Sequence, residues 1–418
     1  MVDIKIIREN AQKVQEAAKN KGVEIDVNHL LEIDRKHREL LLQVQKLREE
    51  RNKFNENIKG KPTEEQIEKG KQLKDQLEKE EHALKAVEEE LKNWLYKIPN
   101  ISKDDVKVGK DETENEVIKK YKEPKKFNFT PRDHVELGQI LDIIDIERAT
   151  KVSGARFNYL KNDAVLLEFA LIQYAFETLV KEGFTPIIPP TLIKRDVMKA
   201  LGYMEHGADE DIFYLEKDDL MLVGTAEHTV VTMHKDEVLQ KKNLPLRYVG
   251  FSSAFRREAG SYGKDTKGIL RVHQFDKVEM VSFVEEGKDD TEHDYLLSLE
   301  EKLFQNLDIP YQVVKMCTGD VGFVQARKYD IEAWMPGQNK YREVTSASTI
   351  TDFQSRRLNI KYQDGSDKKF ANILNGTAFA IGRTIIAILE NYQQEDGSVI
   401  TPQVLQKYIG KTIIKPQK

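Results

Sequence analysis

Residues 251–280 read FSSAFRREAGSYGKDTKGILRVHQFDKVEM. Two runs of strand-forming residues flank a polar loop, SYGKDTKG, in which Gly263 and Gly268 accompany Lys264 and Lys267. This order predicts a β-hairpin. Successive side chains of a strand point to opposite faces of its sheet. On the second strand one face therefore carries Arg271, His273, Phe275, Lys277 and Glu279, and the other carries Val272, Val278 and Met280.

The polar face of this hairpin combines groups that suit a nucleotide. Arg256 and Glu258, two residues apart on the first run, share a face. Arginine presents a planar fork of donors to phosphate oxygens, and an aromatic ring with a stacked arginine can enclose a base. The two loop lysines could close over the phosphates or contact a second anionic substrate. The alternative is a surface hairpin whose opposite charges pair across the strands, each pair contributing about 0.2–1 kcal/mol.

Three further stretches favour a substrate site over a surface hairpin. GTAEHT places Thr225 and Glu227 two residues apart. YREVTSAST supplies Glu343 and Ser346, an acid and a hydroxyl whose oxygens suit a hard cation.

The third stretch, LNGTAFAIGRTIIAILENYQ, runs from Asn375 and Thr377 through a glycine into a predicted helix. Arg383 falls in the first turn of that helix, where its charge opposes the helix dipole. That placement is locally unfavourable and is explained if an anion binds there.

Composition limits the class of protein. The 418 residues carry a formal net charge of −5, so any nucleic-acid binding must use local basic patches. The one cysteine, Cys317, can form neither an internal disulfide nor a thiolate zinc site, and we expect it to be a packed core thiol. The N-terminus has no apolar signal segment and no run is long enough to span a membrane, so we expect a soluble, cytoplasmic protein.

The first part of the chain has the composition of long helices. Apolar residues recur every seven positions at Ile33, Leu40, Leu47 and Phe54, with Val44 and Ile58 between them, and again at Leu77, Leu84 and Leu91, with Leu73, Val87 and Trp94. This pattern predicts a coiled-coil seam. Between the two runs, Gly60 and Pro62 separate the helices, and Thr63 with Gln66 has the spacing of a capping box.

We therefore predict an antiparallel helical hairpin over residues 27–96, with arms of roughly 45 Å. Its function is open between a dimerisation coiled coil and a binding arm. Residues 98–126 are polar and lysine-rich and are expected to be a linker. The remainder alternates short strands with amphipathic helices, one of them over 163–181, and predicts an α+β domain on a mainly antiparallel sheet.

These motifs together resemble the class II aminoacyl-tRNA synthetases, and within them the seryl-tRNA synthetase family of the bacterial and eukaryotic cytosolic type. FTPIIPP around Pro189, FRREAG to HQFDKVE, and GTAFAIGRTIIAILENYQ are similar to the three class motifs. The seryl branch is marked by EAGSYGKDTKGILRVHQFDKVE, TAE, CTGDVGF, YDIEAWMPGQNKYREV and NYQQEDGSV. The resemblance covers nearly the whole chain and implies an N-terminal tRNA-binding arm over 1–115 and a class II catalytic domain over 116–418.

The resemblance implies an ATP site. Arg256 matches the arginine that contacts the α-phosphate and the serine carboxylate, and Arg383 matches the arginine on the γ-phosphate. Glu258 matches the acid near adenine, Phe275 the ring stacked on the base, and Val272 a backbone contact to it.

A second strand completes the expected ATP site. Glu343 and Ser346 match the ligands of an essential Mg2+, and the intervening Val344 and Thr345 join the expected ATP contacts. Arg256, Arg383 and Glu343 are the residues expected to be catalytic. No zinc is expected.

The resemblance also implies the serine pocket and the macromolecular partners. The expected serine-binding residues are Thr225, Glu227, Arg256, Glu279, Asn375 and Thr377. His273 is expected to support the strand rather than to act in catalysis. The implied substrates are L-serine, ATP and tRNA(Ser), with tRNA(Sec) as a second candidate, and the implied assembly is a homodimer without a membrane partner. A few lysines of the arm, such as Lys46, Lys53 and Lys59, could contact tRNA.

Two stretches depart from the family pattern. Thr345 stands where the family usually has serine, and TAEHTVVTMHKDE replaces a commoner apolar continuation. Two rival functions share the fold: an amino acid:carrier-protein ligase, which would lack the long arm, and an inactive paralogue acting as a binding protein, which would have lost Arg256, Glu279 or Arg383.

Overall fold

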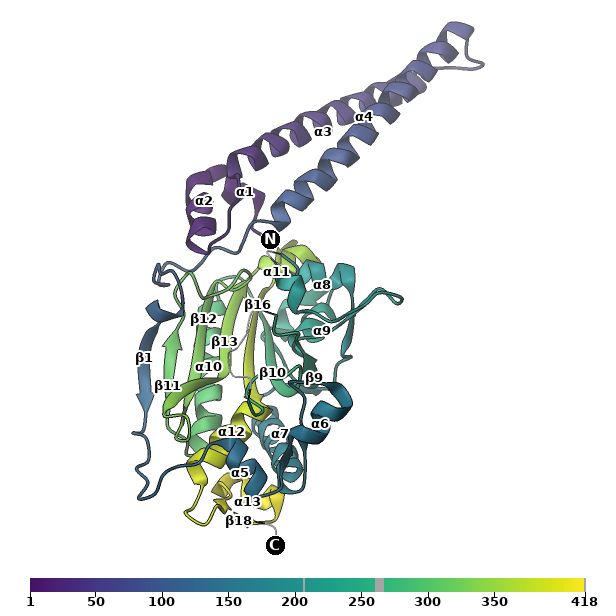
Figure 1. Cartoon of the computed structure of the whole chain (residues 1–418). Coiled ribbons are helices and arrows are strands. Elements are labelled where there is room, and N and C mark those ends of the chain that lie inside the picture. The colour runs from purple at the N-terminus through teal and green to yellow at the C-terminus, as the bar shows by residue number, and fades with distance from the viewer. Residues whose placement is uncertain (206, 260–266, 417–418) are drawn as a thin grey trace. The chain divides into compact units, whose positions relative to one another are not determined.

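The computed structural model describes residues 1–205, 207–259 and 267–416. The chain divides into two compact units, Met1–Ile101 and Ser102–Lys418 (Figure 1). The functional boundary expected after residue 115 stays a prediction. Gly263 and Lys264 of the expected phosphate loop lie outside the described residues, whereas Lys267 and Gly268 lie within them.

The first unit is helical. Its helices are α1 Ile4–Glu9, α2 Ala11–Asn20, α3 Val27–Glu56 and α4 Glu64–Tyr96. The hairpin predicted over 27–96 is confirmed, since α3 and α4 run side by side in opposite directions (Figure 1). Val44, Leu77 and Leu84 are buried between them, with Leu40 and Leu47 packed alongside.

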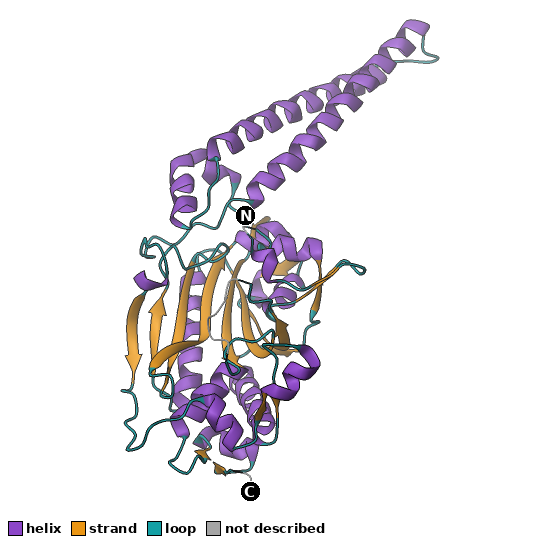
Figure 2. Ribbon diagram, in the orientation of Figure 1, coloured by secondary structure: helices purple, strands orange, loops and turns teal. Residues whose placement is uncertain are grey.

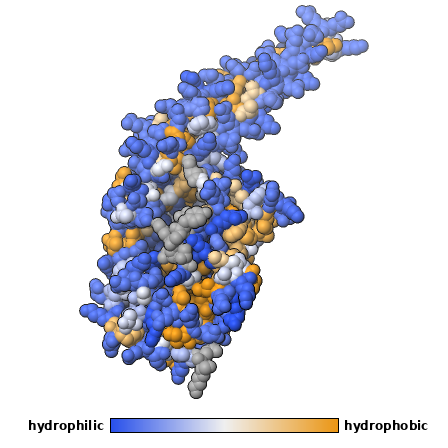
Figure 3. All heavy atoms as spheres, in the orientation of Figure 1, coloured by the Kyte–Doolittle hydropathy of each residue, from blue (hydrophilic) through white to orange (hydrophobic). Residues whose placement is uncertain are grey.

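The turn of this hairpin follows its sequence closely. The predicted capping box forms, because Thr63 Oγ1 accepts from Gln66 N at 3.3 Å and Gln66 Oε1 accepts from Thr63 N at 2.9 Å. Ile58 falls after the end of α3, so the predicted seam stops before it. Hydrophilic residues cover most of the visible face of both helices (Figure 3), as expected when only a narrow apolar stripe is buried.

The second unit is an α+β domain. Its sheet of eight strands has the order β1-β11-β12-β13-β16-β10-β9-β4 (Figure 2). The strands are β1 Glu116–Tyr121, β4 Thr185–Ile187, β9 Leu246–Phe255, β10 Gln274–Val284, β11 Tyr311–Lys315, β12 Arg327–Met335, β13 Lys340–Thr351 and β16 Asn372–Ala380. Only the β4–β9 pair of this sheet is parallel in the part of the chain that the structure describes. The predicted mainly antiparallel sheet is therefore confirmed.

The helices of this unit complete its hydrophobic core. They are α5 His134–Ile140, α6 Ile146–Ser153, α7 Asp163–Lys181, α8 Arg195–Leu201, α9 Glu227–Thr232, α10 Asp289–Asn306, α11 Phe353–Leu358, α12 Ile381–Tyr392 and α13 Gln403–Ile409. The helix predicted over 163–181 is confirmed as α7, which packs on α12 and α13. Helix α10 packs on β13 and β16.

Short elements fill the connections. The 3-10 helices are Glu112–Glu114, Ala208–Asp211 and Lys241–Asn243. The remaining strands are β2 Ile144–Asp145, β3 Tyr159–Leu160, β5 Leu192–Lys194, β6 Tyr214–Leu215, β7 Leu220–Leu222, β8 Val238–Gln240, β14 Lys361–Asp364, β15 Asp367–Phe370, β17 Val399–Ile400 and β18 Ile413–Ile414.

The prediction of a linker over residues 98–126 is wrong for the six residues that form a strand. Residues Glu116–Tyr121 form β1, which pairs with β11 and makes one edge of the sheet. The strand is polar because all but its last residue are exposed, so it lacks the apolar alternation that reveals a strand in sequence.

Two smaller expectations can be compared with the structure. Cys317 is buried as predicted, and its Sγ donates to the Asp111 carbonyl at 3.3 Å. Among the described residues, no helix combines the length and apolarity needed to cross a membrane.

Candidate active site

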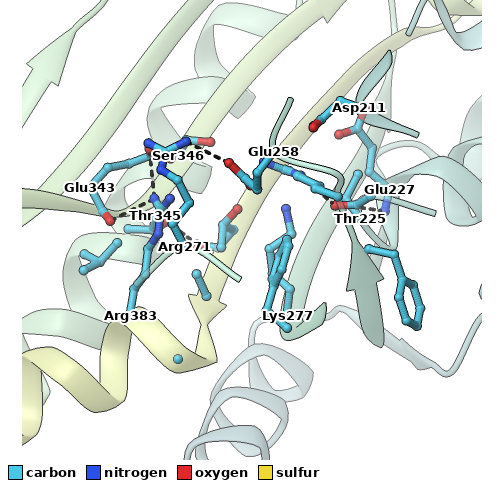
Figure 4. A pocket seen from close by; sticks show the side chains of 18 of the residues that line it. Asp211, Thr225, Glu227, Glu258, Arg271, Lys277, Glu343, Thr345, Ser346 and Arg383 are labelled. Carbon is cyan, nitrogen blue, oxygen red and sulfur yellow. Dashed lines mark hydrogen bonds and ion pairs between the residues drawn. The ribbon is translucent and has the colours of Figure 1, made fainter. Parts of the chain in front are cut away.

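One cavity gathers most of the residues singled out in the sequence. It has a volume of about 720 Å³ and lies over β9, β10, β13 and β16 beside the start of α12. Figure 4 shows side chains from these elements pointing into it. The predicted residues that line it are Thr225, Glu227, Arg256, Glu258, Val272, Phe275, Glu343, Val344, Thr345, Ser346, Asn375, Thr377 and Arg383.

Glu279 is the exception, because it does not line the cavity. Its side chain is fully buried on β10 and accepts a hydrogen bond from Thr377 Oγ1, which does line the cavity, at 2.9 Å. Lys277 forms an ion pair with the same carboxylate. Glu279 thus lies beneath the cavity wall and reaches it through Thr377.

The residues expected near the adenine base lie where β9 ends and β10 begins. The Arg256 guanidinium carbon lies 5.4 Å from the centre of the Phe275 ring, within the range for a cation–π contact. Arg256 follows β9, and its backbone N–H donates to the His273 carbonyl at 3.0 Å. His273 Nδ1 also lies 3.0 Å from the Arg256 carbonyl, consistent with the supporting role expected of this histidine.

A second arginine lies at the start of α12. Arg383 Nη1 contacts Glu343 Oε2 at 3.0 Å and donates to the Glu343 carbonyl at 3.1 Å (Figure 4). Partial desolvation favours the neutral carboxylic acid, although 44% of the side chain is exposed, but Arg383, Lys328 and Arg256 outweigh it and lower the pKa of Glu343 to about 2. Glu343 is therefore an anion throughout the physiological pH range.

Glu258 occupies an unusual backbone conformation. Its φ is +55°, in the left-handed region that residues with a Cβ rarely adopt. Its carboxylate pairs with Arg271 at 2.9 Å, which ties the two sides of the hairpin together (Figure 4). Backbone strain of this kind occurs most often at active sites and ligand-binding positions, where the surrounding structure holds the strained residue in place.

The wall around Glu227 is acidic and buried. Tyr203 donates its hydroxyl to Glu227 Oε1 at 2.9 Å, and Gln354 Nε2 lies 3.5 Å from the same oxygen. Burial, reinforced by the charge of Glu279, raises the pKa of Glu227 to about 7. Glu279 Oε2, Gln354 Oε1 and Asn375 Oδ1 are among the buried acceptors that have no hydrogen-bond partner within the described residues. Polar groups left in this state are suited to a polar ligand.

Metal binding can be judged from the donor set. The described residues contain no group of three or more His, Cys, Asp or Glu side chains placed to hold a metal ion. Glu343 and Ser346 share β13 and both line the cavity, so they offer one carboxylate and one hydroxyl oxygen. Magnesium commonly takes one or two protein oxygens and completes its shell with phosphate oxygens and water. The residues present therefore fit a magnesium–nucleotide complex.

The structure also adds residues that sequence reasoning did not assign to the site. Tyr203, Asp211, His228, Gln325 and Lys328 line the cavity. Tyr203 and Asp211 precede the TAE motif, Gln325 and Lys328 lie between CTGDVGF and YDIEAWMPGQNKYREV, and no local pattern marks these four residues. His228 directly follows the acid of TAE and was noted only as a departure from the family pattern.

The comparisons with known proteins agree with this geometry. The family model described as tRNA synthetase class II core domain (G, H, P, S and T) matches residues 213–392. The fold and the cavity thus define a class II aminoacyl-tRNA synthetase. The model described as seryl-tRNA synthetase N-terminal domain matches residues 1–102.

Relatives of full length narrow the class to one family. The serine–tRNA ligase of Dictyoglomus thermophilum is 46% identical, with all of both chains covered. That of Pyrococcus horikoshii is 43% identical over 100% of this chain and 98% of its own. This chain belongs to the seryl-tRNA synthetase family.

Solved structures give the same result. The crystal structure of seryl-tRNA synthetase from Pyrococcus horikoshii complexed with ATP matches with a TM-score of 0.93 at 42% identity, and all of both chains are covered. The cytoplasmic serine–tRNA ligase of Naegleria fowleri in complex with AMP matches with a TM-score of 0.90 at 31% identity, covering 100% of this chain and 99% of that one.

Proposed function

We propose that this chain activates L-serine with ATP and transfers the seryl group to the 3′ end of tRNA(Ser). The observation that carries the proposal is the presence, around one cavity, of two arginines suited to phosphates and a Glu279–Thr377 pair suited to a small polar amino acid. Membership of the seryl-tRNA synthetase family supports the same reaction.

ATP would bind with its base near Phe275 and Arg256 and its triphosphate toward Arg383. The Arg256 guanidinium lies 5.4 Å from the centre of the Phe275 ring, so a base stacked on Phe275 would lie near the arginine assigned to the α-phosphate. Val272 would contact the base through its backbone, and Glu258 would lie on the adenine side. Arg383 would then meet the γ-phosphate, where the start of α12 also favours negative charge.

Magnesium would bind between the triphosphate and β13. The Glu343 carboxylate and the Ser346 hydroxyl would supply the protein oxygens, with Val344 and Thr345 between them as further contacts of the nucleotide. When bound, the ion neutralises charge that the crowded phosphates develop. Glu343 is suited to this role because the surrounding cations keep it ionised.

Serine would occupy the part of the cavity near Thr225, Glu227, Asn375 and Thr377. Glu227, which lines the cavity, would accept hydrogen bonds from the ammonium or hydroxyl group of the substrate, and Glu279 would act from beneath the wall through Thr377. Alanine lacks the hydroxyl and would leave a buried polar group without a partner, which rejects it strongly. Threonine would be excluded less strongly, by the lack of room for its extra methyl group.

The first chemical step needs no general base, because the serine carboxylate is already ionised at neutral pH. One carboxylate oxygen attacks the α-phosphorus, the bond from that phosphorus to the bridging oxygen breaks, and pyrophosphate leaves with the electron pair. Arg256 would align the carboxylate with the α-phosphate, and Arg383 would stabilise the leaving group. A ribose hydroxyl of the tRNA end then attacks the carbonyl of seryl-adenylate, and AMP is released.

The hairpin of α3 and α4 would hold the tRNA. Its outer surface carries Lys46, Lys53 and Lys59 among many charged residues of both signs. Balanced charge is sufficient for this role, because double-stranded RNA is recognised by its shape and backbone. The same arm could accept tRNA(Sec) where that tRNA shares the features of tRNA(Ser).

The active form would be a cytoplasmic homodimer. Helix α7 exposes Leu166 and Phe169, the latter with 64% of its surface accessible, and Ile188 beyond β4 is 81% exposed. Large apolar side chains exposed in a group mark an interaction surface, and in this family the first class motif is associated with the dimer interface.

Serine-dependent exchange of pyrophosphate into ATP tests the proposal directly. Exchange should require magnesium and serine, should be absent with alanine or glycine and weak with threonine, and should be lost in Arg256→Ala. No exchange from folded protein would overturn the proposal in favour of an inactive paralogue. Exchange with alanine or glycine instead of serine would favour a carrier-protein ligase.

A further inference from the structure

His228 is a cavity residue with no role in the reaction proposed above. It is the second residue of α9 and is buried, with 5% of its surface exposed. One side of its imidazole ring packs against Tyr203, with the ring centres 4.8 Å apart. A buried polar ring in the wall of an active site requires a physical reason, since its nitrogens must find partners.

The partner of His228 is the peptide group of Gly224. The Gly224 N–H donates to His228 Nδ1 at 3.3 Å. The carbonyl oxygen of the same glycine accepts from Arg256 Nε, also at 3.3 Å. One glycine is therefore held at its nitrogen by His228 and at its oxygen by Arg256.

Both side chains also pack against the Cα of this glycine. A Cβ added to Gly224 would lie 3.6 Å from both His228 Cε1 and Arg256 Nε, which is ordinary van der Waals contact. The side chains of His228 and Arg256 are therefore both next to Gly224. Movement of the glycine would change the position of the carbonyl that receives Arg256.

The hydrogen bond fixes the state of the imidazole ring. A backbone N–H can only donate, so Nδ1 must carry no proton and the ring proton must be on Nε2. Burial, together with the charges of Arg256 and Lys277, lowers the pKa of His228 to about 3. The ring is therefore neutral at physiological pH and adds no positive charge beside Arg256.

We propose that His228 is a positioning residue for Arg256, acting through the backbone of Gly224. This inference rests on the proposed function, in which Arg256 binds the α-phosphate and the serine carboxylate. A guanidinium on a flexible side chain aligns two anionic groups only if its orientation is fixed. Arg256 Nε is fixed by the Gly224 carbonyl, which leaves the two terminal nitrogens for substrate.

The test compares two substitutions of similar size. His228→Asn keeps an acceptor close to the position of Nδ1, whereas His228→Leu removes it. His234→Leu is the matched control, because His234 is a buried histidine that bonds to Tyr248 and does not line the cavity. Pyrophosphate exchange is measured for each as kcat and as KM for serine and for ATP.

His228→Leu is expected to lower kcat of exchange by about 10–100-fold, because displacement of a catalytic group by about 1 Å has effects of this size. His228→Asn is expected to restore kcat to within a few-fold of the wild type. His234→Leu should leave kcat unchanged, even where it lowers the melting temperature. Equal kcat for His228→Leu and wild type would overturn the proposal, and so would failure of His228→Asn to recover activity at equal stability.

A spectroscopic measurement keeps the inference testable if the variants do not fold. In protein labelled with 15N-histidine, the His228 ring should show the tautomer with its proton on Nε2 and should not titrate between pH 5 and 9. A proton on Nδ1, or titration near the ordinary histidine value of about 6.5, would overturn it. Absence of exchange in the wild type would instead disprove the proposed function, which separates the two failures.

Discussion

Arg383 contacts both the carboxylate and the backbone carbonyl of Glu343, at 3.0 and 3.1 Å from one guanidinium nitrogen. The contact joins the first turn of α12 to β13 at the edge of the cavity. It places a cation where the helix dipole disfavours one and an anion where magnesium is proposed to bind. Each residue therefore stabilises the charge of the other before any substrate arrives.

Loss of Arg383 should weaken transition-state stabilisation. Arg383→Ala is expected to lower kcat/KM for ATP in exchange by about 100–1,000-fold, since one preorganised donor contributes about 2.7–4 kcal/mol. Arg383→Lys should recover only part of this, because an ammonium lacks the planar fork. Arg356→Ala serves as the control, as Arg356 belongs to α11 and pairs with Asp352. Full activity of Arg383→Ala would contradict the assignment.

The pH profile should report the effect of Arg383 on Glu343. A lowered pKa keeps Glu343 ionised, and the stabilisation from its ion pair is lost only as pH falls from the unfolded value of about 4.3 toward 2. In Arg383→Ala the pKa of Glu343 should rise, so the loss of exchange on the acid side should begin at higher pH than in the wild type. Glu343→Gln should show no acid loss from this group. An identical acid limb in wild type and Arg383→Ala would refute the coupling.

Removal of the Phe275 ring should affect ATP more than serine. Stacking of one base on an aromatic ring contributes about 1–3 kcal/mol. Phe275→Leu is therefore expected to raise KM for ATP about 10-fold and to leave KM for serine nearly unchanged. Phe213→Leu is a control on a ring that stacks with Arg257 instead. The prediction fails if both substrates are affected equally.

Removal of the Thr377 hydroxyl should affect serine more than ATP. Thr377→Val keeps the shape of the side chain but leaves Glu279 Oε1 without this donor. A hydrogen bond to a charged group contributes about 1.5–3 kcal/mol, and the ion pair of the same oxygen with Lys277 remains in the variant. We expect kcat/KM for serine to fall at least 10-fold, while isothermal titration with ATP alone gives an unchanged Kd. Unchanged serine kinetics would disprove the proposed role of Glu279 in serine binding.

Glu300 of α10 should make the unfolding free energy depend on pH. It is fully buried, and the Thr345 side chain and the Thr377 backbone are hydrogen-bonding groups beside it that favour its ionised form. Burial is the main cause that raises its pKa well above the ordinary value. The unfolded chain ionises first, so this group lowers stability progressively as pH rises above about 4.3 toward the folded pKa.

Glu300→Gln removes that titration and should make urea unfolding less sensitive to pH. At pH 8 the variant is expected to be more stable than the wild type by roughly 1–3 kcal/mol. At pH 5 the difference should be smaller. Glu301→Gln is the comparison, because Glu301 accepts from the Tyr311 hydroxyl at 2.8 Å. A larger gain at pH 5 than at pH 8 would contradict the assignment.

Sequence reasoning worked where the physical cause was local. The helices of the arm, its capping box and α7 follow from apolar periodicity and from caps a few residues long. Most of the candidate site was reached in the same way, since its residues occur in contiguous stretches that four adjacent strands, β13, β16, β10 and β9, and the start of α12 bring together.

The failures concern features set by distant parts of the chain. Strand β1 is polar and exposed, and only its pairing with β11 makes it a strand. Tyr203 reaches Glu227 from α8's C-terminal end, and Gln354 reaches it from α11. Burial of Glu279 beneath the cavity wall depends on the packing of the whole sheet. These contacts join residues that are far apart in the chain, so no short stretch of sequence could predict them.

Strand β1 also limits where a fragment containing the catalytic domain can begin. A catalytic fragment that began at residue 116 would keep the strand but lose two anchors just before it, Lys103 bound to Asp289 at 2.6 Å and Asp105 bound to Arg327. A fragment that began near residue 102 would retain both. Studies of the separated arm, or exchange of arms between relatives, should therefore place the junction before Lys103, so that the sheet keeps its edge strand and the segment that leads into it.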